Sequence, residues 1–118
     1  MKQEKYIALD AVTATTTSRG IPMGPNGRTS IQFIAASISS GNGVFTVAVS
    51  NDNTNWIAYN KLTTNITNTN AQTDTRVASV TLSSNTSAVV SIPENFGFIR
   101  VTATRTTDGA YSAVVVTS

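Results

Sequence analysis

Hydrophobic and polar residues alternate over several short stretches of this chain. In residues 44–50, Phe45, Val47 and Val49 fall on one face of an extended segment, because successive side chains of a strand point to opposite sides. Similar alternation or β-branched runs recur at residues 31–37, 56–62, 76–82, 88–92, 98–104 and 110–116. No segment longer than a few residues has apolar residues at the helical spacing of three and four. The pattern predicts an all-β protein.

Turn-forming residues separate these stretches and predict three hairpins. The turns lie at residues 39–43, 83–87 and 105–109. They contain Gly, Asn and Asp, which suit tight turns. The expected strand pairs are 31–37 with 44–50, 76–82 with 88–92, and 98–104 with 110–116. About seven to eight short strands with frequent turns indicate an antiparallel β-sandwich, jelly-roll-like in type.

The first 30 residues differ from the rest of the chain. Residues 20–27 hold two prolines and three glycines, which remove hydrogen-bond donors and permit positive φ, so they indicate a turn-rich connection. We therefore expect an extended N-terminal arm over residues 1–30 and one β-sandwich domain over residues 31–118. The Thr- and Asn-rich residues 63–74 are expected to form a long exposed loop.

The composition predicts a surface made mainly of hydroxyl and amide groups. The 118 residues include 20 Thr, 13 Ser and 11 Asn, against 8 Lys and Arg and 6 Asp and Glu. The net charge of +2 comes from scattered basic residues, so we expect no nucleic-acid partner. The chain has no apolar run of signal-peptide or membrane-spanning length. We expect synthesis in the cytoplasm and no membrane partner.

The sequence offers little for catalysis or metal binding. It has no histidine and no cysteine, and most of its carboxylates sit in or beside predicted turns. Residues 51–55 cluster Asp and Asn oxygens, but they include one carboxylate, and Leu62 stands where a helix–loop–helix calcium site would place its closing Glu. We interpret 51–55 as a turn that brings Trp56 into the core. We expect no enzyme activity, no cofactor and no metal.

Two aromatic surfaces have alternative interpretations. Phe98, Arg100 and Thr102 alternate with apolar residues and are expected to share a solvated face with Tyr111, although such a face also suits single-stranded nucleic acid. Trp56 and Tyr59 are the candidate platform for stacking on a sugar, but a lone Trp at the start of a strand is more often part of a core.

Three segments of the chain resemble small β-sandwich proteins of tailed-phage virions. They are Val-Ser-Asn-Asp-Asn-Thr-Asn-Trp at 49–56, Phe-Gly-Phe-Ile-Arg-Val at 96–101 and Asp-Gly-Ala-Tyr-Ser-Ala at 108–113. This pattern is similar to that of capsid decoration (cement) proteins. A second resemblance is to discoidin-like carbohydrate-binding sandwiches, from which the chain departs by its shorter length and by Asn53 where Gly is usual.

The first resemblance implies a non-enzymatic structural protein located in the virion. Its partners would be capsid or other virion proteins and further copies of the chain, as a trimer, a dimer or a larger ring. The N-terminal arm then supplies the candidate contacts, which are Tyr6, Arg19, Ile21, Met23 and Arg28. The discoidin-like alternative implies an adhesion module that uses Trp56 and Tyr59.

Overall fold

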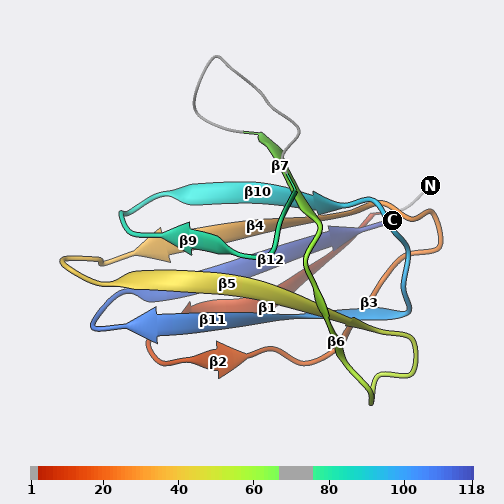
Figure 1. Ribbon diagram of the computed structural model, residues 1–118, viewed down its shortest axis with the longest axis horizontal. Helices are drawn as coiled ribbons and strands as arrows, with labels where there is room; N and C mark the ends of the chain where they lie inside the picture. Colours follow the sequence, from red (N-terminus) through yellow and green to blue (C-terminus); the bar gives the residue numbers. More distant parts are fainter. Residues whose placement is uncertain (1–2, 67–75) are drawn as a thin grey trace.

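Two antiparallel β-sheets packed face to face make up the protein (Figure 1). The computed structural model describes residues 3–66 and 76–118, and within these ranges there is no helix. The described part of the chain accordingly contains no helix able to cross a membrane. The expected all-β sandwich is confirmed.

The first sheet, here called sheet I, contains six strands in the order β1-β12-β4-β10-β7-β8. Their bounds are Glu4–Val12 (β1), Ala110–Thr117 (β12), Thr29–Ala36 (β4), Ser87–Ile92 (β10), Leu62–Ile66 (β7) and Arg76–Val77 (β8). The pairing of β1 with β12 joins segments from opposite ends of the sequence, with Glu4 opposite Thr117.

The second sheet, sheet II, has the order β2-β11-β5-β6, with β3 also beside β11 and β9 beside β5. Its strands are Thr16–Thr17 (β2), Ile21–Pro22 (β3), Phe98–Thr106 (β11), Asn42–Ser50 (β5), Ile57–Tyr59 (β6) and Val80–Leu82 (β9). Twelve strands are therefore described where about seven to eight were expected, because several of them contain only two or three residues.

Aromatic rings join the two sheets across the core. Phe33 of β4 stacks on Phe45 of β5, with ring centroids 4.5 Å apart. Tyr111 of β12 meets the same Phe45 edge to face at 5.9 Å. All three side chains are fully buried, together with aliphatic residues from both sheets. The alternation read from residues 44–50 is confirmed, since Phe45, Val47 and Val49 all face the core.

The three predicted hairpins are wrong. The strand pairs β4 and β5, β9 and β10, and β11 and β12 follow each other in sequence, but each pair is split between the two sheets. Their turns are therefore bridges over the edge of the core. Tyr111, expected on a solvated face beside Phe98, is consequently buried on the opposite sheet.

Two of these bridges are fastened to each other by Asp108. Its carboxylate accepts hydrogen bonds from the backbone N–H groups of Ser39, Ser40 and Gly41 at 3.2, 3.2 and 2.9 Å. Desolvation raises the pKa of Asp108, but the N–H donors of Gly41, Ser40 and Ser39 together bring this pKa below its ordinary value. The β4–β5 and β11–β12 connections are thus held together by an ionised carboxylate.

The N-terminal segment belongs to the sandwich. β1 forms one edge of sheet I, and β2 and β3 pair with β11 along one edge of sheet II. Ile21 is completely buried, so its side chain contributes to the core and offers no surface to a partner. The expected boundary at residue 30 therefore does not separate two structural units. The predicted loop at 63–74 begins inside β7, and its remainder lies outside the described residues.

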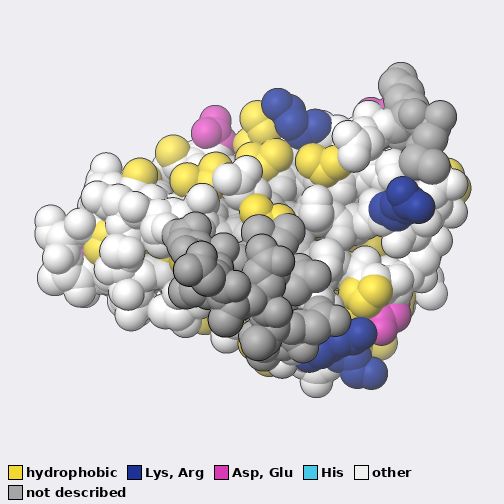
Figure 2. Space-filling model, turned by 90° about the horizontal axis from the view of Figure 1, so that it is seen from above, with side chains coloured by type: hydrophobic (Ala, Val, Ile, Leu, Met, Phe, Trp, Pro, Cys, Tyr) yellow, Lys and Arg dark blue, Asp and Glu magenta, His cyan; other side chains and the backbone are white. Residues whose placement is uncertain are grey.

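The molecular surface has few charged groups, as the composition suggests. The face shown in Figure 2 consists mainly of uncharged side chains and backbone atoms, with hydrophobic side chains over part of it and separate small groups of basic and acidic side chains.

Thr107 occupies a strained backbone conformation in the β11–β12 connection. Its φ of 68° lies in the left-handed region, which a β-branched residue rarely adopts. We expect Thr107→Gly to raise the free energy of unfolding by about 1 kcal/mol, because glycine removes the strain. Chemical denaturation measures the change. Thr104→Gly, inside strand β11, should instead lower the free energy of unfolding, and a loss of stability in both variants would contradict the assignment of strain to Thr107.

Candidate functional site

An apolar groove lies at the end of the sandwich where β5 turns into β6. It consists of two adjoining depressions of about 340 and 230 Å³, which share Val49, Ile57 and Phe96. Ile57 is 70% exposed and is the most exposed large hydrophobic residue that the structure describes. We call the two depressions together the Ile57 groove. Polar residues line its two ends: Ser50, Asn51, Asp52 and Asn55 at one, and Tyr59, Asn60, Lys61 and Glu94 at the other.

Asp52 folds the loop that forms the first end of the groove. Its Oδ1 accepts hydrogen bonds from the backbone N–H groups of Thr54 and Asn55 at 2.9 and 2.8 Å, and the Asn55 amide donates to Oδ2 at 2.7 Å. The Ser50 hydroxyl donates to Oδ1 at 2.8 Å. These bonds, led by those from Asn55, hold the pKa of Asp52 well below its ordinary value. The interpretation of residues 51–55 as a turn is confirmed.

The groove floor is fixed by contacts between the β5–β6 and β10–β11 connections. The Asn51 Oδ1 accepts a hydrogen bond from the Gly97 backbone N–H at 2.8 Å. This bond holds the neighbouring Phe96 ring, which lies edge to face against Tyr59 at 6.0 Å. Most of the groove residues therefore come from strands β5 and β6 and from the two connections that this hydrogen bond joins.

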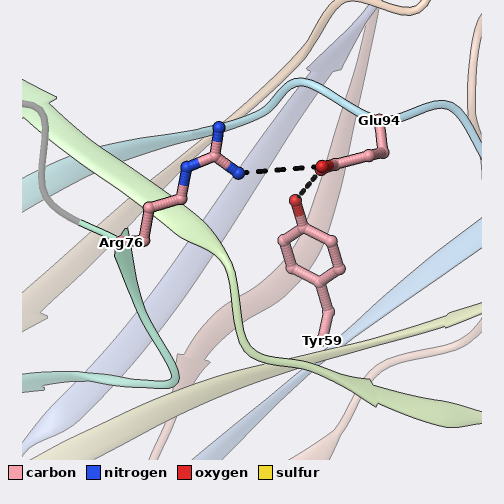
Figure 3. A network of polar contacts seen from close by, with 3 residues as sticks. All are labelled: Tyr59, Arg76 and Glu94. Carbon is pink, nitrogen blue, oxygen red and sulfur yellow. Dashed lines mark hydrogen bonds and ion pairs between the residues drawn. The ribbon is translucent and has the colours of Figure 1, made fainter.

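Tyr59, Glu94 and Arg76 form a polar network at the second end (Figure 3). The Tyr59 hydroxyl donates a short hydrogen bond to Glu94 Oε1, and Arg76 Nη1 lies 3.7 Å from Glu94 Oε2. The hydrogen bond from Tyr59 lowers the pKa of Glu94 below its ordinary value. Burial, followed by this bond to the carboxylate, raises the pKa of Tyr59 well above its ordinary value.

This network predicts a specific pH dependence for Tyr59→Phe. Because the folded pKa of Glu94 is lowered, its contribution to stability is complete above its ordinary value of 4.5 and is lost as the pH falls through the folded pKa. Because the folded pKa of Tyr59 is raised, its contribution is complete below its ordinary value of 10.0 and is lost as the pH rises through the folded pKa. Tyr59→Phe should lower the free energy of unfolding by about 1 kcal/mol near neutral pH. It should also reduce the dependence of this free energy on pH at both the acidic and the alkaline end.

Urea denaturation at a series of pH values checks this expectation. The matched control is Tyr6→Phe, because Tyr6 is a half-buried tyrosine on β1, outside the network of Tyr59, Glu94 and Arg76. This control should leave the shape of the stability profile unchanged. A Tyr59→Phe profile parallel to that of the wild type would show that the network does not couple stability to pH.

The Ile57 groove is suited to contact with the surface of another protein more than to proton transfer. A general acid at neutral pH needs a raised carboxyl pKa, whereas those of Asp52, Glu94 and Asp108 are all lowered. Among the described residues, no group of three or more His, Cys, Asp or Glu side chains is placed to hold a metal ion. An apolar groove with polar residues at its rim is suited to contact with another protein.

Trp56 does not enter the core, which corrects the expected position of this residue. It is half-buried, and the Arg100 guanidinium lies 4.5 Å from its ring centroid. Arg100 alternates with the buried Ile99 and Val101, so this pair covers the outer side of sheet II. Tyr59 is only 6% exposed and faces inward beside Val47. Trp56 and Tyr59 therefore point to opposite sides and form no shared platform for a sugar.

The candidate contact residues of the N-terminal segment are spread over both sheets. Tyr6 and Met23 are half-buried against the core, and Ile21 is inside it. Arg19 and Arg28 are exposed, one between β2 and β3 and the other just before β4. These five residues do not form one surface.

Sequence reasoning missed the Ile57 groove. Ile57 follows Trp56 in a stretch whose inward face was ambiguous, and nothing in the local pattern indicates that the isoleucine is exposed. Glu94 and Phe96 come from a short segment after Pro93 without a recognisable motif. Only the folded chain brings them beside Tyr59.

Comparison with known proteins shows a similarity of fold but no match of the sequence to a family or to a curated protein. No family model matches the chain, and no curated protein matches it in sequence. Its structure is similar to the crystal structure of the SPBc2 prophage-derived protein YomS, with a TM-score of 0.62. The likeness covers 98% of this chain and 94% of that chain at 11% sequence identity. The two proteins therefore share a β-sandwich fold over nearly their whole lengths.

Proposed function

We propose that this chain is a non-enzymatic structural protein of a phage particle. The observation that carries the proposal is the full-length likeness to a prophage-derived protein, which extends over 98% of the chain. In finer terms, we propose a capsid decoration protein that is made in the host cytoplasm and held on the virion by protein–protein contacts.

The strand order supports this proposal. Strands β1-β12-β4-β10 of sheet I face strands β2-β11-β5-β6 of sheet II. We propose that these eight strands, between which the chain repeatedly crosses, form a jelly-roll arrangement, which is common in viral capsid domains and also in lectins. The absence of a shared Trp56 and Tyr59 surface favours the capsid alternative over the lectin-like one.

The Ile57 groove is our candidate contact with the particle. Its centre is apolar, and Asp52, Lys61 and Glu94 lie at its ends, so it offers both signs of charge around Ile57. Such a site combines desolvation of the aliphatic centre with orientation by the polar rim. The same chemistry needs no cofactor and no nucleic acid.

Particles made by the phage or lysogen that encodes the chain provide the test. We expect the protein to co-sediment with purified capsids and to appear in their mass spectra. Purified chain added to particles that lack it should rebind, and Ile57→Asp should weaken rebinding by about tenfold or more, because it places a charge in the desolvated centre of the contact.

The matched control is Ser84→Asp, which adds the same charge at an exposed bend outside the groove. This variant should rebind like the wild type. Recovery of the protein only in the particle-free fraction would contradict the virion proposal. Equal rebinding of Ile57→Asp and wild type would leave the chain on the particle but remove the groove as its contact.

A further inference from the structure

The outer face of sheet I carries a patch of aliphatic side chains. Its members lie between residues that are buried in the core or packed against it, and therefore point away from the core: Ile7 on β1, Val114 and Val116 on β12, Ile34 on β4 and Val89 on β10. Ile7 is 52% exposed and the others are partly exposed. Figure 2 looks onto this side of the molecule and shows hydrophobic side chains gathered over it. We call this surface the sheet I patch.

The charged groups of the patch lie on its edge strand, on either side of Ile7. Lys5 stands opposite Val116, whereas Ile7 stands opposite Val114. Asp10 follows the buried Leu9 and is exposed. The outward positions of β12, β4 and β10 carry no charged residue.

We infer that the sheet I patch binds a second copy of this chain in a two-fold symmetric dimer. A two-fold interface brings the same surface of both copies together, so the surface must complement itself. With the axis crossing the strands at Ile7 and Val114, each Ile7 meets its counterpart, and Lys5 of each copy faces Asp10 of the other. The order of a positive charge, an aliphatic residue and a negative charge along β1 satisfies this condition.

Face-to-face packing fits β1 better than the addition of strands at its edge. The register of β1 on β12 is interrupted between Ile7 and Leu9 and again between Leu9 and Val12. Such bulges twist an edge away from further strand pairing, whereas they leave the outer face accessible.

The size of the patch predicts a weak association. Four strands at a spacing of about 4.8 Å, each with three outward residues about 7 Å apart, cover roughly 400 Å² per copy. This is about half of the ~800 Å² that each partner buries in a standard interface. We therefore expect a dimer that forms at high micromolar concentration. The inference concerns the isolated chain and does not depend on the proposed function.

Analytical ultracentrifugation of the purified chain over a wide concentration range tests the dimer. We expect the weight-average mass of the wild type to rise toward that of a dimer, and Ile7→Asp to weaken association by about tenfold or more. Ser84→Asp introduces the same charge at an exposed position outside both the patch and the Ile57 groove, and it should associate like the wild type. Thermal unfolding of each variant verifies that it remains folded.

Charge reversal tests the geometry of the dimer. Lys5→Asp alone, or Asp10→Lys alone, places like charges opposite each other and should weaken association by about fivefold. The double variant has the same net charge as the wild type and should recover its affinity, because each aspartate again faces a lysine. A wild type that stays monomeric, an unchanged affinity of Ile7→Asp, or a double variant no better than the single variants would overturn the inference.

Discussion

Phe45→Ala is expected to lower the free energy of unfolding by about 4 kcal/mol. Phe45 is fully buried on β5, where it stacks on Phe33 at 4.5 Å and meets the edge of Tyr111 at 5.9 Å. Removing the ring leaves a cavity between the sheets and deletes both aromatic contacts. For a domain with a typical stability of about 5–15 kcal/mol, this loss is a large part of the total.

Urea denaturation followed by the fluorescence of the single tryptophan gives the measurement. Thr46→Ala is the matched control, because Thr46 is the next residue on the same strand but faces solvent. It should change the free energy of unfolding by no more than about 0.5 kcal/mol. A similar small change in Phe45→Ala would mean that the two sheets do not depend on this ring.

Gly109→Ala should lower the free energy of unfolding by about 3 kcal/mol. Gly109 has a φ of 108°, a conformation that strains any residue with a Cβ. The added Cβ would also lie 2.4 Å from the Tyr111 hydroxyl oxygen and 2.6 Å from Tyr111 Cζ. It would therefore displace the buried ring and its hydrogen bond to the Asp108 carbonyl oxygen, which is 2.9 Å long.

Gly27→Ala separates these two effects. Gly27 also has a positive φ, of 68°, but the atom nearest to an added Cβ is Asn95 Cβ at 3.7 Å. This control should lose only about 1 kcal/mol, from backbone strain alone. Combining Gly109→Ala with Tyr111→Phe should give a smaller loss than the sum of the single losses, because the hydroxyl that makes the closest contact is gone. Equal losses in Gly27→Ala and Gly109→Ala would show that contact with Tyr111 is unimportant.

The inward face of most long strands could be predicted from the sequence, but the strand partners could not. Phe33 and Phe45 lie on alternating stretches that are joined by a short turn, and a hairpin would place both on one face. In the structure they face each other across the core, from different sheets. Both arrangements bury the same side chains, so a hydrophobic pattern cannot distinguish them.

The N-terminal strand escaped prediction for a different reason. Ile7 and Leu9 are two residues apart, and a regular strand would place both on one side, yet Ile7 is exposed and Leu9 is buried. The irregular register between them removes the alternation on which the prediction depends. The polar network of the candidate site could not be predicted from the sequence either, because Tyr59, Arg76 and Glu94 come from three separate segments.

The pairing of β1 with β12 has a consequence for how the protein is made. On the ribosome β1 emerges before its partner β12, which follows only after nearly the whole described sequence, so Glu4 cannot pair with Thr117 until then. Until then β1 has no partner in sheet I, and the edge of β4 that pairs with β12 is unpaired as well. Folding must therefore be late and dominated by contacts between distant residues, which is typical of slow-folding β-proteins. Nascent chains released before β12 should expose the aliphatic side of β4 and be the species most prone to aggregate.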